Sequence, residues 1–133
     1  QSLPAGLAEI YRVLRPGGRI ALSDITAHPD RLPGELSGLA AWIACIADAR
    51  PLDEVGDLLS AAGLVVQTVE RHDAALGEMV DRVIARLEAA RILGGAIGGL
   101  GGRLDEATAV ARAAAHAVAR GDLGYGVVVA RRP

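Results

Sequence analysis

The chain has 133 residues, 51% of them hydrophobic, and a formal net charge of −2 at pH 7. This length fits one domain, expected over residues 1–133, with an aliphatic core because aromatic residues make up 2% of the sequence. The weak charge argues against a nucleic-acid or anionic membrane partner, and no apolar stretch reaches the roughly 20 residues of a membrane helix. With 1 cysteine an internal disulfide is excluded, which favours a cytoplasmic location.

The first segment predicts a helix, a tight turn and a strand. Leu7, Ile10, Tyr11 and Leu14 recur at helical spacing, and the sequence Pro-Gly-Gly at 16–18 ends that helix. Residues 19–25, "RIALSDI", predict a strand covered on both faces, because their apolar residues do not alternate cleanly with polar ones. A loop is expected from residue 26 to residue 34.

The middle of the chain predicts two helices and a second strand. An apolar stripe from Leu36 to Ala47 indicates a helix that carries Trp42 and Cys45 on a neighbouring face. Pro51 opens the next helix, which Gly63 is expected to cap at its C-terminus. Residues 64–70 then predict the second strand.

The last third predicts two helices and a closing strand. Asp73 is expected to be the N-cap of a long helix. The apolar residues that this helix carries are Leu76, Met79, Val80, Val83, Ile84 and Leu87. The glycine-rich stretch 94–102 separates it from a helix over about 104–120, and residues 125–131 predict the third strand. The element order indicates an α/β fold with a three-stranded sheet and about five helices.

Common catalytic motifs are missing from the sequence. There is no G-x-G-x-x-G, no P-loop lysine and no G-x-S-x-G elbow. The three histidines are far apart, with no pair at the spacing of a helical metal site. His116 is expected to be simply solvated, whereas His72, directly after a predicted strand, is kept as a candidate site residue.

Three segments carry a resemblance to a known family. "EIYRVLRPGGRIALSDI" resembles the helix, turn and strand 5 of class I S-adenosylmethionine-dependent methyltransferases. "LLSAAGLVVQTVE" resembles the helix and strand 6 of that family, and "GYGVVVARRP" resembles its strand 7, an antiparallel strand inserted between strands 5 and 6. The resemblance implies the C-terminal half of a Rossmann-like methyltransferase fold. The stretch "AAWIACIADARPLDEVGDLLSAAGL" is most similar to the arsenite methyltransferase-like, or type 11, branch.

The resemblance also has implications for the cofactor and the substrate. In this family S-adenosylmethionine is bound through strands 1 to 4, which correspond to nothing in residues 1–133. We therefore expect the cofactor-binding half to be absent from this chain. S-adenosylmethionine is expected to bind only the full-length enzyme, and the isolated chain is expected to be inactive. The implied acceptor is a small molecule, with arsenite or another soft or heteroatom nucleophile as the candidates.

Five residues are candidates for the acceptor side of the site. Ser23 and Asp24 end a strand where open α/β sheets bind ligands, although Asp24 could equally cap the following loop. Cys45 is either a thiolate ligand for a soft centre or a small residue packed in a helix interface. Trp42 is either a substrate wall or part of a core or subunit contact, and His72 completes the set.

The strand at Arg19–Ile25 is expected to need a partner. Without a strand 4 beside it, this apolar strand is an open sheet edge, which promotes pairing with another chain. We expect either a second copy of the chain or a separate N-terminal half to cover it. The alternative to an enzyme is a non-catalytic dimerisation or interaction module derived from a methyltransferase.

Overall fold

The computed structural model describes residues 2–37, 46, 48–94 and 101–133. Within these ranges the chain has an α/β fold in which four α-helices and two short 3₁₀ helices flank a three-stranded sheet. The predicted fold class is therefore confirmed.

The sheet has the strand order β1-β3-β2, so the strand that comes last in the chain lies in the centre. Strand β1 spans Arg19–Ala27, β2 spans Val65–Arg71 and β3 spans Leu123–Arg131. Both outer strands run antiparallel to β3, with Arg19 opposite Arg131 and Ala27 opposite Leu123. All three predicted strands are present. Strand β1 continues to Ala27 because its last two residues still pair with β3.

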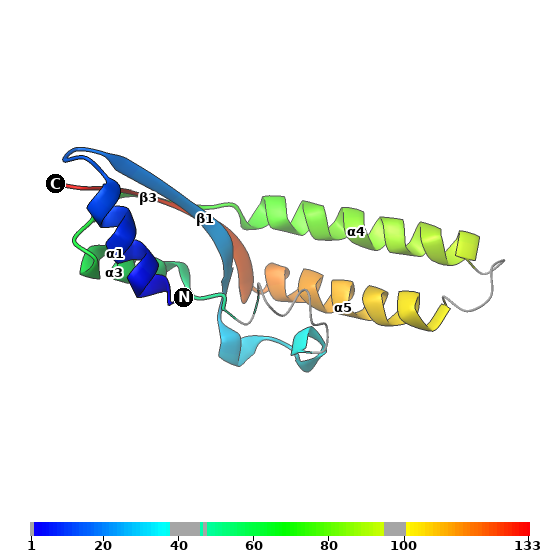
Figure 1. The fold of residues 1–133 in the computed structure, drawn as a ribbon. Helices are drawn as coiled ribbons and strands as arrows, with labels where there is room; N and C mark the ends of the chain where they lie inside the picture. The colour runs from blue at the N-terminus through cyan, green and yellow to red at the C-terminus, as the bar shows by residue number, and fades with distance from the viewer. Residues whose placement is uncertain (1, 38–45, 47, 95–100) are drawn as a thin grey trace.

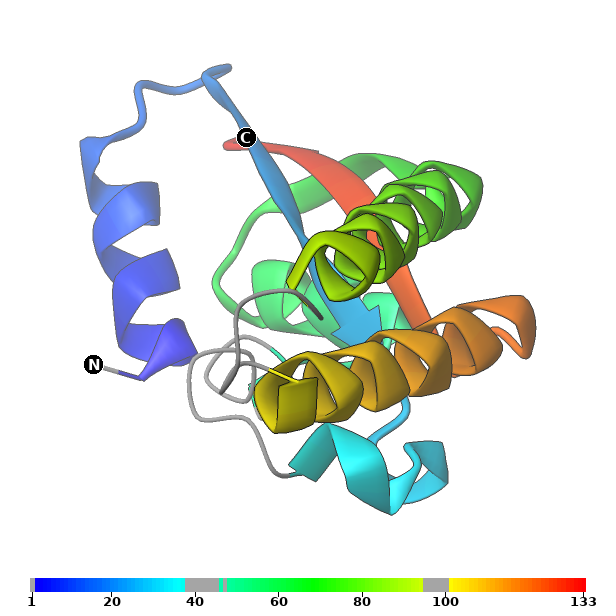
Figure 2. The same ribbon diagram turned by 90° about the vertical axis from the view of Figure 1, so that its right-hand side faces the viewer.

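The helices form two groups (Figure 1). Helix α1 (Leu3–Val13) and helix α3 (Leu52–Ala61) lie beside one end of the sheet. Helix α4 (Asp73–Gly94) and helix α5 (Gly101–Ala119) run side by side and project beyond the other end; Figure 2 shows this hairpin nearly end-on. The two ion pairs Arg91–Asp105 and Arg112–Glu88 join the hairpin helices.

Some predicted elements differ or cannot be compared. The predicted loop at 26–34 holds the end of β1 and the 3₁₀ helix η1 (Pro29–Arg31). The helix expected from Leu36 to Ala47 falls mainly outside the described residues, although Leu36 is buried within the 3₁₀ helix η2 (Gly34–Ser37). The glycine-rich stretch 94–102 also lies mostly outside them.

Two apolar clusters lie on opposite faces of the sheet, because side chains alternate along each strand. On one face α1 and α3 pack against the strands, with Leu7, Leu59 and Val128 almost fully buried. On the other face α4 and α5 cover the end of β1 and the start of β3. The strand residues of this second cluster are Ile25, Ala27, Leu123 and Tyr125.

Two local predictions at helix ends have different outcomes. Gly63 adopts φ +90° and the Leu64 N–H donates to the Leu59 carbonyl at 3.1 Å, which confirms the predicted cap of α3. Asp73, predicted to be an N-cap, is instead the first residue of α4. Its Oδ1 accepts a hydrogen bond from the Tyr125 backbone N–H at 3.1 Å, so Asp73 attaches α4 to β3.

A membrane span is not found in the described part of the chain, since none of its helices combines sufficient length with sufficient hydrophobicity to cross a bilayer.

Candidate functional site

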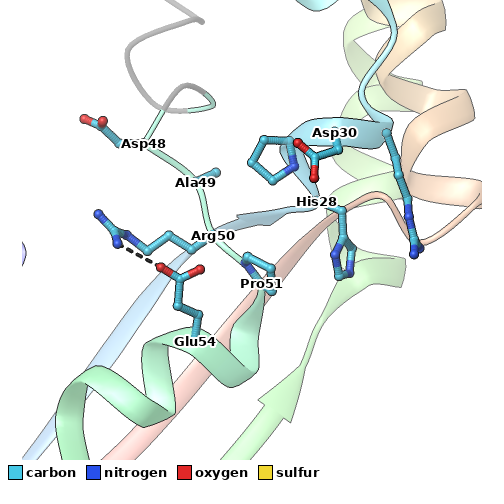
Figure 3. Close-up of a pocket in the computed structure, with 9 residues that line it drawn as sticks. His28, Asp30, Asp48, Ala49, Arg50, Pro51 and Glu54 are labelled. Carbon is cyan, nitrogen blue, oxygen red and sulfur yellow. Dashed lines mark hydrogen bonds and ion pairs between the residues drawn. The ribbon is translucent and has the colours of Figure 1, made fainter. Parts of the chain in front are cut away.

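The carboxyl end of β1 opens onto a polar hollow of about 460 Å³ between η1 and the start of α3 (Figure 3). Its volume falls in the range of about 300 to 1,000 Å³ that is usual for small-molecule sites. Its walls come from two segments that are separate in sequence. The lining residues are His28, Pro29, Asp30, Arg31, Asp48, Ala49, Arg50, Pro51 and Glu54.

Backbone pairing at the end of β1 holds the two walls together. Thr26 and Arg50 form an isolated parallel bridge, and the Ala27 N–H donates to the Arg50 carbonyl at 3.1 Å. The His28 N–H donates to the Asp122 carbonyl at 2.9 Å. These bonds place the segment before α3 beside the end of β1, where open α/β sheets bind ligands.

The charges of this hollow are partly paired. Arg50 donates to Glu54 at 3.0 Å, and Arg31 lies 4.0 Å from Asp122, a carboxylate whose side chain is 10% exposed. Asp30 and Asp48 form no ion pair within the described residues. The hollow therefore presents free carboxylate oxygens, which accept hydrogen bonds from hydroxyl or amine groups. No trio of His, Cys, Asp or Glu positioned to hold a metal ion occurs in the described ranges.

A second, apolar groove of about 370 Å³ lies between α4 and the sheet. Ile25 of β1 and Tyr125 of β3 form its floor, and α4 forms its side through Ala75, Leu76, Met79 and Arg82. Met79 and Val83, predicted to belong to the apolar face of α4, are 43% and 41% exposed. Of the apolar residues expected along this helix, Leu76 and Val80 are buried, whereas Met79 and Val83 are not.

The structure separates Ser23 from Asp24. Strand alternation puts Ser23 on the face of Ile25 and the apolar groove, and Asp24 on the face covered by α3. Asp24 Oδ1 accepts a hydrogen bond from the Ile25 N–H at 2.8 Å, a local contact with its own neighbour. Of the two residues, Ser23 shares the sheet face of the groove, although neither residue lines it.

The other candidates do not join Ser23. His72 follows β2, at the sheet edge opposite β1; its N–H donates to the Tyr125 carbonyl at 2.7 Å, and its Nε2 lies 3.0 Å from Glu70 Oε2. It lines neither hollow. Trp42 and Cys45 lie outside the described residues, so the interpretations given for them stay predictions.

Several residues of the two hollows were not recognised in the sequence. Arg50 and Glu54 carry an i, i+4 pattern that usually marks a solvated helix face. Arg82 stands within a helix rich in charge, and nothing in its local pattern separates it from other surface arginines. Their grouping depends on which strand end meets which helix, and that is a property of the tertiary fold.

Comparisons with known proteins agree with this fold. No family model matches the sequence. Phosphoethanolamine N-methyltransferase 2 from Haemonchus contortus, solved with phosphomonomethylethanolamine and S-adenosylhomocysteine, superposes with a TM-score of 0.72 at 15% identity. That match covers 100% of this chain and 30% of the other.

Two further structures match as well. A putative sarcosine dimethylglycine methyltransferase from Galdieria sulphuraria has a TM-score of 0.74 at 19% identity, covering 97% of this chain and 47% of that one. A cyclopropane synthase from Mycobacterium tuberculosis has a TM-score of 0.70 at 14% identity, covering 97% and 49%. The chain thus spans less than half the length of each of these proteins. It has the fold of the C-terminal part of S-adenosylmethionine-dependent methyltransferases.

Proposed function

We propose that this chain is the acceptor-side part of an S-adenosylmethionine-dependent methyltransferase that acts on a small molecule. The observation that carries the proposal is the sheet order β1-β3-β2, with an antiparallel β3 between two strands that are parallel to each other. This order matches the C-terminal part of the methyltransferase structures. The carboxyl end of β1, with the polar hollow beyond it and the apolar groove at Ile25, is the proposed acceptor side.

The proposal assigns S-adenosylmethionine to a separate cofactor-binding part, which would lie against β1. Within the described residues β1 has a partner strand on one side alone; its other edge pairs with Arg50 at Thr26 and Ala27, and the backbone groups of that edge before Thr26 are free for a further strand. The sheet face beyond the groove, formed by Ala21, Ser23, Val127 and Val129, belongs to neither apolar cluster. A cofactor-binding part would pair with that edge and cover that face, and the matched proteins extend well beyond this chain.

Catalysis in such an assembly depends mainly on positioning. The methyl group would pass by in-line displacement from the sulfonium of the cofactor to a nucleophilic atom of the acceptor, and holding both in line lowers the entropic part of the barrier. The residues described here would orient the acceptor; Ser23 lies on the sheet face of the groove, and Asp30 and Asp48 line the polar hollow.

Calorimetric titration with S-adenosylmethionine tests the proposed division, in which the cofactor binds a separate part and this chain orients the acceptor. We expect no micromolar binding by residues 1–133 alone, and micromolar binding by a longer protein in which a cofactor-binding part accompanies them. A glycine-rich strand, loop and helix is expected in that part. Micromolar binding by this chain alone would contradict the proposed division, and a longer protein that neither binds S-adenosylmethionine nor transfers its methyl group would contradict the enzymatic proposal.

The finer proposal of arsenite as acceptor depends on Cys45. It is supported by the resemblance of the surrounding sequence and by the affinity of thiolates for soft centres. Replacing Cys45 by Ser in the longer protein should then abolish arsenite binding. Unchanged binding would leave Cys45 as a packing residue.

A non-catalytic interaction module is the second candidate, favoured by the hairpin of α4 and α5. Ile92 and Leu93 at the end of α4 are 81% and 74% exposed, and together they offer apolar surface for contact with another molecule. Methyl transfer by the longer protein would argue against this candidate.

A further inference from the structure

The apolar groove between α4 and the sheet combines an apolar floor with a cationic rim. Ile25, Leu76, Met79 and Tyr125 supply apolar surface, while Arg82 supplies the charge. Ala75 contributes only a methyl group, so the groove stays open at this point of the helix. Such a lining suits a ligand with a hydrocarbon chain and one polar end.

The charges of α4 are distributed unevenly around the helix. Arg82 and Arg86 are four residues apart, so they are neighbours on the helix surface and lie near the flank of Met79 and Val83. Glu88, on another flank, pairs with Arg112 of α5. The hollow between α4 and α5 on that other side is lined by the carboxylates Asp73 and Asp81.

Arg82 and Arg86 form no ion pair with any described residue. Glu78 stands one turn before Arg82 on the helix, at a spacing that permits a pair, but it does not line the groove and is not within ion-pair distance. Two neighbouring guanidinium groups without a carboxylate repel each other, and an anion placed between them relieves that repulsion. Arginine is well suited to this role because its planar donors match the two oxygens of a carboxylate or phosphate.

From these observations we infer that the groove binds an amphiphile with an apolar chain and an anionic head group. The chain lies over Ile25, Met79 and Tyr125, and the head group binds Arg82, with Arg86 one turn further along. The meaning of this site for catalysis rests on the proposed function, since Ser23 lies on the same sheet face and β1 would meet the cofactor-binding part at its free edge. The binding itself does not depend on that function.

Methyl-labelled methionine gives a direct test, because Met79 is the sole methionine of the chain. Decanoate, kept below its micelle concentration, should shift the single methyl resonance of Met79 in a saturable titration. Decyltrimethylammonium, with the same chain and the opposite charge, should bind at least fivefold more weakly. No shift with decanoate, or equal affinity for both amphiphiles, would overturn the inference.

Two matched variants locate the anionic contact. Arg82→Gln should weaken decanoate binding at least fivefold and remove the preference over decyltrimethylammonium. Arg103→Gln, on an exposed arginine of α5 that lines neither hollow, should leave both affinities unchanged. Both side chains are exposed, so both variants are expected to fold. Equal behaviour of the two variants would contradict the assignment to Arg82.

The two proposals fail in different ways. If decanoate binds the groove but the longer protein transfers no methyl group, the binding site stands and the proposed function fails. If the longer protein methylates an acceptor whose binding decanoate does not inhibit, the proposed function stands and the groove is not the acceptor site.

Discussion

Arg132 joins the two ends of the chain. Its backbone exchanges hydrogen bonds with the turn after α1, at Gly17 and Gly18. Its guanidinium donates to the carbonyls of Tyr11, Arg12 and Leu14 and lies 4.5 Å from the centroid of the Tyr11 ring. These carbonyls end a helix and have no partner within it, so a cation is favoured there. The packing of α1 against the sheet therefore depends in part on a residue beyond β3.

Replacing Arg132 by Ala should lower the free energy of unfolding by about 1 to 3 kcal/mol, since it removes charge-assisted bonds to several carbonyls. Arg132→Lys should recover part of the loss, because an ammonium keeps the charge without the planar donors. Urea denaturation followed by circular dichroism measures both. Arg12→Ala is the control: its ion pair with Glu9 is on the surface, and a loss as large as that of Arg132→Ala would contradict the explanation.

Gly124 is required by the attachment of α4 to β3. A Cβ atom at this position would meet the carboxylate of Asp73, and Thr26 Oγ1 would lie 3.0 Å from it. Asp73 cannot withdraw without losing its bond to the Tyr125 N–H. This strand residue must therefore stay without a side chain.

Gly124→Ala should lower the free energy of unfolding by about 1 to 3 kcal/mol, the usual cost of overpacking. Gly56→Ala is the matched control within α3, where a Cβ meets no atom within 4 Å. It should raise stability by up to about 1 kcal/mol, because alanine favours the helix interior over glycine. Equal effects of the two substitutions in thermal unfolding would rule out steric conflict at Gly124.

At the scale of elements, the sheet combines one fully paired strand with two exposed ones. Strand β3 pairs on both sides, and along it every second residue is buried, whereas six of the seven residues of β2 are exposed. In strand β1 the last two residues, Thr26 and Ala27, are buried, whereas the residues before them are exposed or half-buried. The stability of the sheet is therefore concentrated in its central strand.

Hydrogen exchange measured by NMR should show this ranking. In the isolated chain the amides of β3 should exchange slowest, and β1 should contain amides before Thr26 that exchange much faster, because that part of its outer edge has no partner among the described residues. In the longer protein these fast amides of β1 should become protected. Uniformly slow exchange along β1 in a monomer of residues 1–133 would contradict the open edge.

The sequence predicted the elements better than the site. The period of Leu7, Ile10 and Leu14 and the glycine at 63 are local signals, and the structure agrees with both. Asp73 was misassigned because a carboxylate before a helix usually caps it, whereas here it bonds to a strand 52 residues away. The two hollows also depend on contacts between residues far apart in the sequence. Spacing alone therefore could not assign Arg50 to the polar hollow or Arg82 to the apolar groove.

For the molecule as a whole, the described helices cover one face of the sheet more fully than the other. Helices α1 and α3 cover the first face, whereas α4 and α5 cover the second face at the end of β1 and the start of β3; Ala21 and Val129, further along that face, belong to neither apolar cluster. This asymmetry is the expectation for one part of a larger assembly, and it also provides a surface on which two copies of the chain could associate.

Sedimentation velocity of residues 1–133 at increasing concentration should therefore show reversible self-association. Ala21→Lys, which places a charge on the uncovered face of β1, should weaken that association at least fivefold. Ala109→Lys, on an exposed position of α5, is the control and should leave it unchanged. A sedimentation coefficient independent of concentration would show that neither this face nor the open edge of β1 promotes association between copies.

The central place of β3 sets the order in which the chain can acquire its structure. On the ribosome β1 and β2 emerge first, yet they are not neighbours in the sheet, and each waits for Leu123–Arg131 to leave the exit tunnel. The hairpin of α4 and α5 has mostly local contacts and can form earlier, since local contacts assemble faster than distant ones. Translation that stops before β3 would thus release two strands without their central partner, a species prone to aggregation.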